Sequence, residues 1–198
     1  MGHKTLENLV KAKLKKTDKI ETLDLKGLQI NVVERGDDAS IVLRRNRKKE
    51  IKDLVEKCRL TRNQLENVKT IDLSYNNIEI FNFEILKELA SLESLDLSHN
   101  LIEDIVLFED FSSQPSEIFK ELKVLKLYEN KIKSFDNFDL KYFKNLQELR
   151  IDYANFEKLD DYKNFATNKH SSYKVNIYLL YLKKNQVKAT MQTNIYHS

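Results

Sequence analysis

The stretch LESLDLSHNLIEDI, residues 92–105, places one asparagine at the centre of a run of aliphatic residues. Leu95 and Leu97 alternate with polar residues, as in a strand with one buried face. Asn100 follows three residues later, with Ile102 and Ile105 beyond it. Burying an amide costs free energy unless its hydrogen bonds are made. We therefore expect Asn100 to bond backbone groups of a turn that follows the strand.

The same arrangement occurs once on each side of this stretch. VKTIDLSYNNIEIF (68–81) and LKVLKLYENKIKSF (122–135) share the pattern L-x-x-L-x-L-x-x-N-x-[IL]-x-x-[ILF] with it. The pattern places Asn76, Asn100 and Asn130 at equivalent positions. Repetition at such a period is typical of a solenoid, in which each unit buries its core against its neighbours.

Weaker copies of the pattern lie on both sides of these three. They are IETLDLKGLQINVV (20–33), SIVLRRNRKKEI (40–51), LQELRIDYANFEKL (146–159) and YKVNIYLLYL (173–182). Leu28 and Ala154 replace the asparagine in the first and third copies, whereas Asn46 keeps it in the second. The last copy supplies a plausible final strand.

This pattern resembles that of leucine-rich-repeat proteins over about residues 20–182. The resemblance implies an α/β solenoid shaped as a short curved horseshoe, with a parallel β-sheet on the concave face and helices and coils on the convex face. We expect an N-terminal capping helix over 1–19, about six to seven repeats over 20–182, and a basic tail over 183–198.

Four segments carry apolar residues at the three-to-four-residue spacing of helices. They are TLENLVKAKL (5–14), EIKDLVEKC (50–58), FNFEILKELASL (81–92) and SSQPSEIFKEL (112–122). In the last, Ser113 precedes the helix and Pro115 falls in its first turn, where proline is tolerated. The first segment is expected to cap the first repeat.

The bulk composition limits the class of protein. The 198 residues are 41% hydrophobic and 33% charged, and no apolar run is long enough to cross a bilayer. The N-terminal residues lack the apolar stretch of a signal peptide, and Cys58 is the only cysteine, so no disulfide can form within the chain. We expect an intracellular protein, cytoplasmic or nuclear, with no membrane association.

Candidates for catalysis or metal binding are lacking in the sequence. His3, His99, His170 and His197 have no ligand spacing with one another or with Cys58. No glycine-rich phosphate loop or nucleophile elbow occurs. We expect no catalytic residue, cofactor, metal or small-molecule substrate, and a protein that is not an enzyme.

The concave face is where we expect a protein partner to bind. Asp24, Asp72 and Asp96 share one column of this face, which continues through Lys126 and Arg150 and, in this alignment, Asn176. Ser98 and His99, beside Asn100, are expected to face outward. Tyrosine and arginine are enriched at interface hot spots. The residues predicted to contact a partner are Asp72, Tyr75, Asp96, His99, Lys126, Tyr128, Arg150, Tyr153 and Tyr178.

The sequence therefore predicts a non-enzymatic protein–protein interaction module that acts as a scaffold or subunit of a larger assembly. An alternative is a ribonucleoprotein- or ribosome-associated factor that contacts RNA through basic ends. The stretch ETLDLKGLQINVVE, residues 21–34, resembles the opening repeat of the spliceosomal A-prime family of leucine-rich-repeat proteins. The RNA-binding residues of this alternative are Arg44, Arg45, Arg47, Lys48, Lys49, Lys52, Lys183, Lys184 and Lys188.

Overall fold

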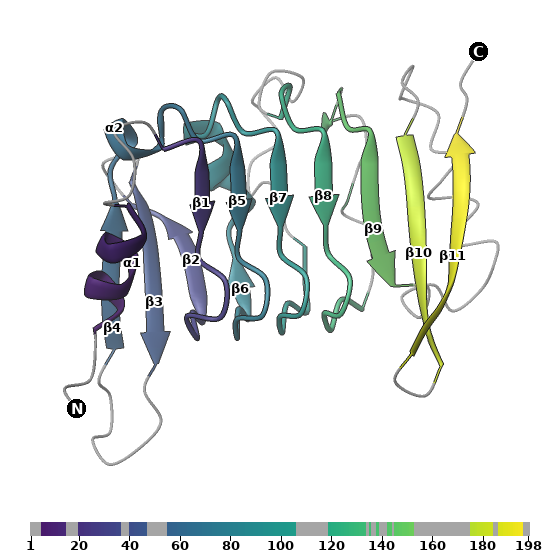
Figure 1. Cartoon of the computed structure of the whole chain (residues 1–198), viewed down its shortest axis with the longest axis horizontal. Helices are drawn as coiled ribbons and strands as arrows, with labels where there is room; N and C mark the ends of the chain where they lie inside the picture. Colours follow the sequence, from purple (N-terminus) through teal and green to yellow (C-terminus); the bar gives the residue numbers. More distant parts are fainter. Residues whose placement is uncertain are drawn as a thin grey trace.

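A seven-stranded sheet runs through the whole molecule in the computed structural model (Figure 1). The structure describes residues 5–14, 20–36, 40–46, 55–105, 119–133, 135, 138, 142–143, 145–152, 175–183 and 186–195. In spatial order the strands are β1 (Thr22–Asp24), β5 (Thr70–Asp72), β7 (Ser94–Asp96), β8 (Val124–Lys126), β9 (Glu148–Asp152), β10 (Val175–Lys183) and β11 (Gln186–Ile195). Neighbours from β1 to β10 are parallel, and β10 and β11 form an antiparallel hairpin.

The register of this sheet follows the repeat predicted from the sequence. The second residue of each of the strands β1, β5, β7, β8 and β9 is apolar and buried, and these residues form one row: Leu23, Ile71, Leu95, Leu125 and Leu149. The aliphatic residue two positions after each member of this row is also buried, as is the isoleucine two positions after the asparagine. A single repeat could not bury these side chains alone, so the core exists only because the repeats stack.

The asparagines form the predicted ladder between repeats. Asn100 donates from Nδ2 to the carbonyl oxygens of Leu97 and Leu73, both at 3.0 Å, and its Oδ1 accepts the N–H of Ile78 at 3.0 Å. Asn76 and Asn130 make equivalent bonds to their own turn and to the preceding repeat. Each amide therefore ties two successive turns together, which satisfies its buried polar atoms.

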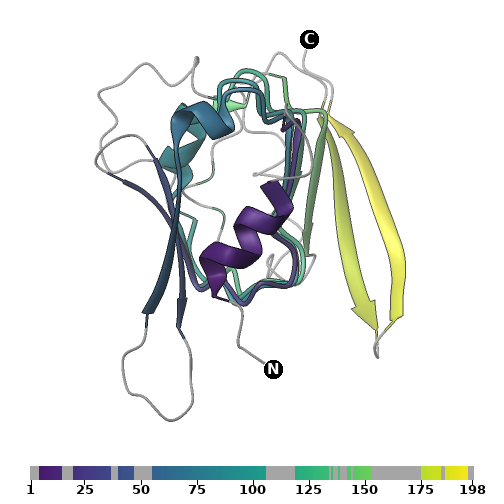
Figure 2. The same ribbon diagram turned by 60° about the vertical axis from the view of Figure 1, so that its left-hand side comes forward.

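A second, four-stranded sheet forms the opposite layer at the N-terminal end (Figure 2). Its order is β4 (Val55–Leu60), β3 (Ile41–Asn46), β2 (Val32–Arg35) and β6 (Ile80–Phe81). The segment 40–51 was predicted to be a repeat strand of the concave sheet, and this is wrong. β1 pairs directly with β5, while β3 pairs with β2 and β4 in the second sheet.

The helix predicted over 50–58 is also wrong, because its described part belongs to strand β4. Cys58 and Leu60 are buried whereas Lys57 and Arg59 are exposed, which is the two-residue alternation of a strand. The three-residue step from Val55 to Cys58 fits a helix equally well on so short a stretch. Pairing with β3 decides in favour of the strand.

Two of the other predicted helices are present. Helix α1 (Leu6–Leu14) buries Leu6 and Val10 and lies between the two sheets at the N-terminal end of the molecule (Figure 2). Segment 81–92 contains η1 (Phe83–Glu88), which is a 3-10 helix. A short helix, α2 (Arg62–Leu65), precedes β5. Most of the segment 112–122, including Ser113 and Pro115, lies outside the described residues.

The C-terminal region differs from its prediction in two respects. Residues 183–198, expected to be a tail, contain strand β11, which pairs with β10 along its length. In β10 the backbone register aligns Tyr178, rather than Asn176, with Arg150 of β9. In the described residues, no helix is both long and apolar enough to cross a membrane.

Candidate functional site

The outer face of the seven-stranded sheet, opposite the core, carries the predicted column of charged residues. Strand register places Asp24, Asp72, Asp96, Lys126 and Arg150 side by side on consecutive strands. All five side chains are partly or fully exposed, as expected for positions that alternate with the buried row. The column therefore changes from acidic to basic between β7 and β8.

The aspartates of this column have a structural role within their own repeats. Asp24, Asp72 and Asp96 each accept, through Oδ1, a hydrogen bond from the backbone N–H two residues later, at 2.9–3.0 Å. This local bond is the Asx turn, which favours a chain reversal directly after the aspartate. The carboxylates therefore help to form the turns that end β1, β5 and β7.

The charges at the acid-to-base junction neutralise one another. Lys126 Nζ lies 2.9 Å from Asp96 Oδ2, and Arg150 Nε lies 2.6 Å from Glu148 Oε1. Partial burial favours the neutral form of Asp96, but hydrogen bonds from the Ser98 hydroxyl, from Lys126 and from the Ser98 N–H outweigh it. The pKa of Asp96 is therefore lowered from its ordinary value. This part of the face offers a partner few unpaired charges.

The turns after the strands share an unusual backbone conformation. Gly27, Tyr75, His99 and Glu129 occupy the same turn position with φ of 67°, 55°, 54° and 57°. Their N–H groups form a second ladder: Gly27 donates to the carbonyl of Ser74, Tyr75 to that of Ser98 and His99 to that of Tyr128, at 3.0–3.1 Å. The left-handed region suits glycine, and a residue with a Cβ pays roughly 1–2 kcal/mol there.

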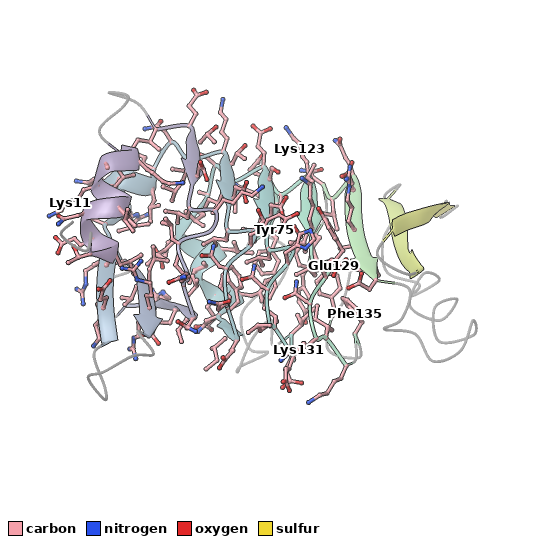
Figure 3. All side chains as sticks on the ribbon, turned by 60° about the horizontal axis from the view of Figure 1, so that its bottom comes forward. Lys11, Tyr75, Lys123, Glu129, Lys131 and Phe135 are labelled. Carbon is pink, nitrogen blue, oxygen red and sulfur yellow. The ribbon has the colours of Figure 1, made fainter. Side chains whose placement is uncertain are left out.

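The side chains at these turns form a continuous row that we call the ring row: Lys26, Tyr75, His99 and Tyr128. Tyr75 stacks on His99 with ring centroids 4.0 Å apart, and His99 meets Tyr128 edge-on at 5.2 Å. Lys26 Nζ lies 4.4 Å from the centroid of the Tyr75 ring. Figure 3 looks toward this edge of the sheet, along which Tyr75 and Glu129 both lie. Tyr75 is 53% exposed.

The repeats of this chain match the sequence profiles of a known family. A family profile described as "Leucine rich repeat" matches residues 39–102, and a second, described as "Leucine Rich Repeat", matches residues 91–114. This chain is a leucine-rich-repeat protein. The first match includes the segment of β3, although strand pairing places β3 outside the repeat sheet. No curated protein sequence matches the chain. Leucine-rich-repeat domains generally mediate protein–protein interactions and are typically not enzymes.

Asp152 ends the N–H ladder of the leucine-rich-repeat turns. The N–H of Glu129 donates to Asp152 Oδ2 at 2.7 Å, in place of the backbone carbonyl that accepts in the earlier turns. The other oxygen, Oδ1, is buried without a hydrogen bond to any described residue. Burial raises the pKa of Asp152 to about 6, against the opposing hydrogen bonds from the Glu129 and Asn130 N–H groups.

Three residues expected on the outer face of the leucine-rich repeats are either buried or only partly described by the structure. Ser98 was expected to face outward, but it is 1% exposed and donates its hydroxyl to Asp96 Oδ1 at 2.6 Å. Tyr153 lies outside the described residues. Tyr178 is placed only by the backbone register of β10, which aligns it with Arg150.

The residues of the RNA-binding alternative divide in the same way. Arg45 was proposed to contact RNA, but its side chain is 8% exposed and paired with Glu56, so it is not an accessible RNA-binding residue. Arg44, on the same strand, pairs with Glu34. Neither lies on the outer face, because β3 belongs to the small sheet. Arg47, Lys48, Lys49, Lys52 and Lys184 lie outside the described residues, and Lys183 and Lys188 are placed by their backbone alone, in β10 and β11.

Sequence reasoning missed how the ring row is organised. Tyr75, His99 and Tyr128 were predicted as contacts, but their stacking and the position of Lys26 over Tyr75 depend on turn geometry. One signal was available: Gly27 stands at the turn position that Tyr75 and His99 occupy in later repeats. Glycine at one copy indicates a backbone conformation that the other residues adopt at a cost. In the described part of the chain, no group of acidic, histidine or cysteine side chains could hold a metal ion.

Proposed function

We propose that this leucine-rich-repeat protein binds a protein partner along the ring row and the adjoining outer face, as a subunit of a larger assembly. The observation that carries the proposal is Tyr75, which is 53% exposed although it occupies a left-handed turn. Asparagine or glycine would occupy that turn at lower cost. Large aromatic rings kept exposed at such positions are suited to interface hot spots.

The charged side chains of the outer face are already paired, which favours the aromatic rings as the main contacts of a partner. Lys126 pairs with Asp96, Arg150 with Glu148, and each aspartate of the column bonds its own turn. Exposed ion pairs contribute little free energy, and a partner would have to break or replace them. The rings need no such exchange, because a partner only has to displace water from their edges.

The test is capture of partners from an extract of the source cells by the wild-type protein and by two matched variants. Tyr75→Asn with Tyr128→Ala removes the two tyrosines of the ring row. Ile80→Ala is the control, because Ile80 is 60% exposed but lies on β6 of the small sheet. We expect the control to retain a partner that the double variant loses, with folding of both checked by thermal melts.

Two results would count against the proposal. If the double variant captures the same proteins as the wild type, the ring row does not bind them. If nuclease treatment releases the captured proteins, RNA holds them and the ribonucleoprotein alternative gains support. That alternative, including the A-prime resemblance, stays a prediction that rests on basic residues other than Arg45.

A further inference from the structure

In the described part of the chain, four strands lie at sheet edges, and three of them are short or protected. β1 has three residues and β6 has two. β4 carries Glu56, Lys57 and Arg59 and lies against α1, whose Leu6 N–H bonds to the Glu56 carboxylate. Short strands, charges and covering helices are the usual protection of an edge against a further strand. The fourth edge strand, β11, has ten residues and pairs, within the described residues, with β10 alone (Figure 1).

The protection of β11 is confined to its hairpin end. The register of the hairpin shifts where Tyr181 pairs with Ala189 and Leu182 pairs with Val187, so Lys188 is the extra residue of a β-bulge. Beyond the bulge, the segment ATMQTNI (189–195) contains no charged residue, glycine or proline. An uncharged strand of this length is typical of segments that pair with another strand.

Backbone register divides the segment 189–195 between the two faces of the sheet. Ile177 of β10 pairs with both Leu149 and Thr193, and Leu179 pairs with both Ile151 and Met191. Leu149 and Ile151 are fully buried, and paired residues share a face of a sheet. The core-face positions of the segment are therefore Ala189, Met191, Thr193 and Ile195, and the outer-face positions are Thr190, Gln192 and Asn194.

We propose that two copies of this protein form a dimer by antiparallel pairing of their 189–195 segments, with the two-fold axis at Gln192. This register uses all seven residues and places Ala189 opposite Ile195 and Met191 opposite Thr193, so core-face positions meet core-face positions. A shift by one residue would place core-face positions opposite outer-face positions.

The symmetry of this pairing favours a second copy over a different protein. Any extended strand can bond to an edge, but the segment 189–195 has no charge with which to select an acidic or basic partner. Pairing with itself opposes no like charges, and it joins the two seven-stranded sheets into one continuous sheet. Because the contact uses the free edge of both copies, assembly stops at the dimer.

The size of the contact sets its strength. Seven residues of antiparallel strand extend over about 23 Å, which makes the contact small for a protein interface. We expect a weak dimer with a Kd on the order of 1–100 µM.

The first experiment measures the mass of the purified full chain by analytical ultracentrifugation over a range of concentrations. We expect a reversible monomer–dimer equilibrium. Gln192→Lys places two lysines opposite each other at the two-fold axis and should weaken the dimer by at least about tenfold. Asn176→Lys is the matched control, because it adds the same charge to the outer face of β10, one strand inside the edge. It should leave the dimer nearly unchanged.

The second experiment tests the register by cysteine cross-linking. Gln192→Cys should form a disulfide-linked dimer on mild oxidation, because directly opposed residues have Cα atoms about 4.5–5.5 Å apart, as a disulfide requires. Thr190→Cys and Asn194→Cys should each cross-link poorly alone and efficiently when mixed, since each position lies opposite the other. The unaltered protein should not cross-link, because Cys58 is buried.

Three outcomes would overturn the proposal: a wild-type protein that stays monomeric at about 200 µM, a dimer that Gln192→Lys and Asn176→Lys weaken equally, or Thr190→Cys cross-linking as well alone as with Asn194→Cys. Thermal melts establish that the variants are folded. A monomer whose β11 amides become protected only with a captured protein would assign the edge to a different partner and also refute the proposal. The ring row shares no residue with 189–195, so the two proposals stand or fall separately.

Discussion

The two sheets of this protein differ in how their strands are held in place. In the seven-stranded sheet, the short strands from β1 to β9 pair with one another in parallel and in the same register. Each asparagine ties its turn to that of the preceding repeat. In the four-stranded sheet, the β3–β4 hairpin is fastened by specific charged contacts, of which Arg45–Glu56 is the most buried. Repetition makes the first sheet stable through many equivalent contacts, whereas the second depends on a few individual ones.

The largest effect should come from the buried pair of the small sheet. Arg45→Ala or Glu56→Ala breaks this pair and leaves the other charge buried, so we expect a loss of about 3–5 kcal/mol. Glu56→Ala also removes the hydrogen bond to the Leu6 N–H at the start of α1, and Arg45→Ala removes the bond to the Leu28 carbonyl. Urea denaturation measures the loss.

The double variant Arg45→Met with Glu56→Leu should lose far less, because it buries no unpaired charge. Removing the exposed pair Glu103–Lys133 serves as a control and should change stability little. If each single variant at Arg45 or Glu56 matched this control, the hairpin would not depend on its charged pair.

In the seven-stranded sheet, the asparagine ladder should give the next largest effect. Asn100→Leu leaves the Ile78 N–H without its acceptor and removes one of the two amide donors from the carbonyl oxygens of Leu73 and Leu97, so we expect a loss of about 1–3 kcal/mol in thermal or urea denaturation. Asn77→Leu, at an exposed neighbouring position, should change stability by less than about 0.5 kcal/mol. Equal melting temperatures for the two variants would contradict the ladder.

Asp152, at the end of the N–H ladder, should make the stability of the folded protein depend on pH. Because its pKa is raised to about 6 from 3.8, the folded protein binds more protons than the unfolded chain between these values. The contribution of Asp152 to stability therefore decreases as the pH rises through this window. Asp152→Asn should raise the melting temperature by a few degrees at pH 7.5 and by much less at pH 4.5. An equal change at both pH values would mean that the carboxylate does not titrate in this range.

The smallest effect on stability is expected for the residue most important to the proposed function. Tyr75→Asn loses the stacking on His99 but relieves the left-handed backbone, two contributions of about 1 kcal/mol each and of opposite sign. We expect a net change below about 1 kcal/mol in urea denaturation. A loss well above that value would show that the ring row is needed mainly for folding.

The comparison of the sheets also explains which features could be predicted from the sequence. The rows of Leu95 and Asn100 were predictable because the stretches 68–81, 92–105 and 122–135 share one pattern and the structure keeps one register. The β3–β4 hairpin was not, since Asn46 imitates the repeat asparagine and the step from Val55 to Cys58 fits a helix as well as a strand. Only the pairing of strands distant in sequence resolves such short patterns.

The candidate site was predictable in its residues but not in its geometry. The alternation of the strands indicated that Asp72, Asp96 and Lys126 lie on the outer face. Stacking of Tyr75 on His99 depends on positive φ values, for which Gly27 at the equivalent turn position was the signal in the sequence, but the glycine does not specify how the rings pack. The burial of Arg45 could not be foreseen either, because its partner Glu56 comes from a segment interpreted as a helix.

The most direct test of the account is amide hydrogen exchange of the protein alone and in complex with a captured partner. If the outer face and ring row bind the partner, peptides covering residues 70–76, 94–100 and 124–130 should exchange more slowly in the complex. Peptides covering 41–46 and 55–60, in the small sheet, should be unchanged. Protection confined to the small sheet, with none along the ring row, would contradict the central claim.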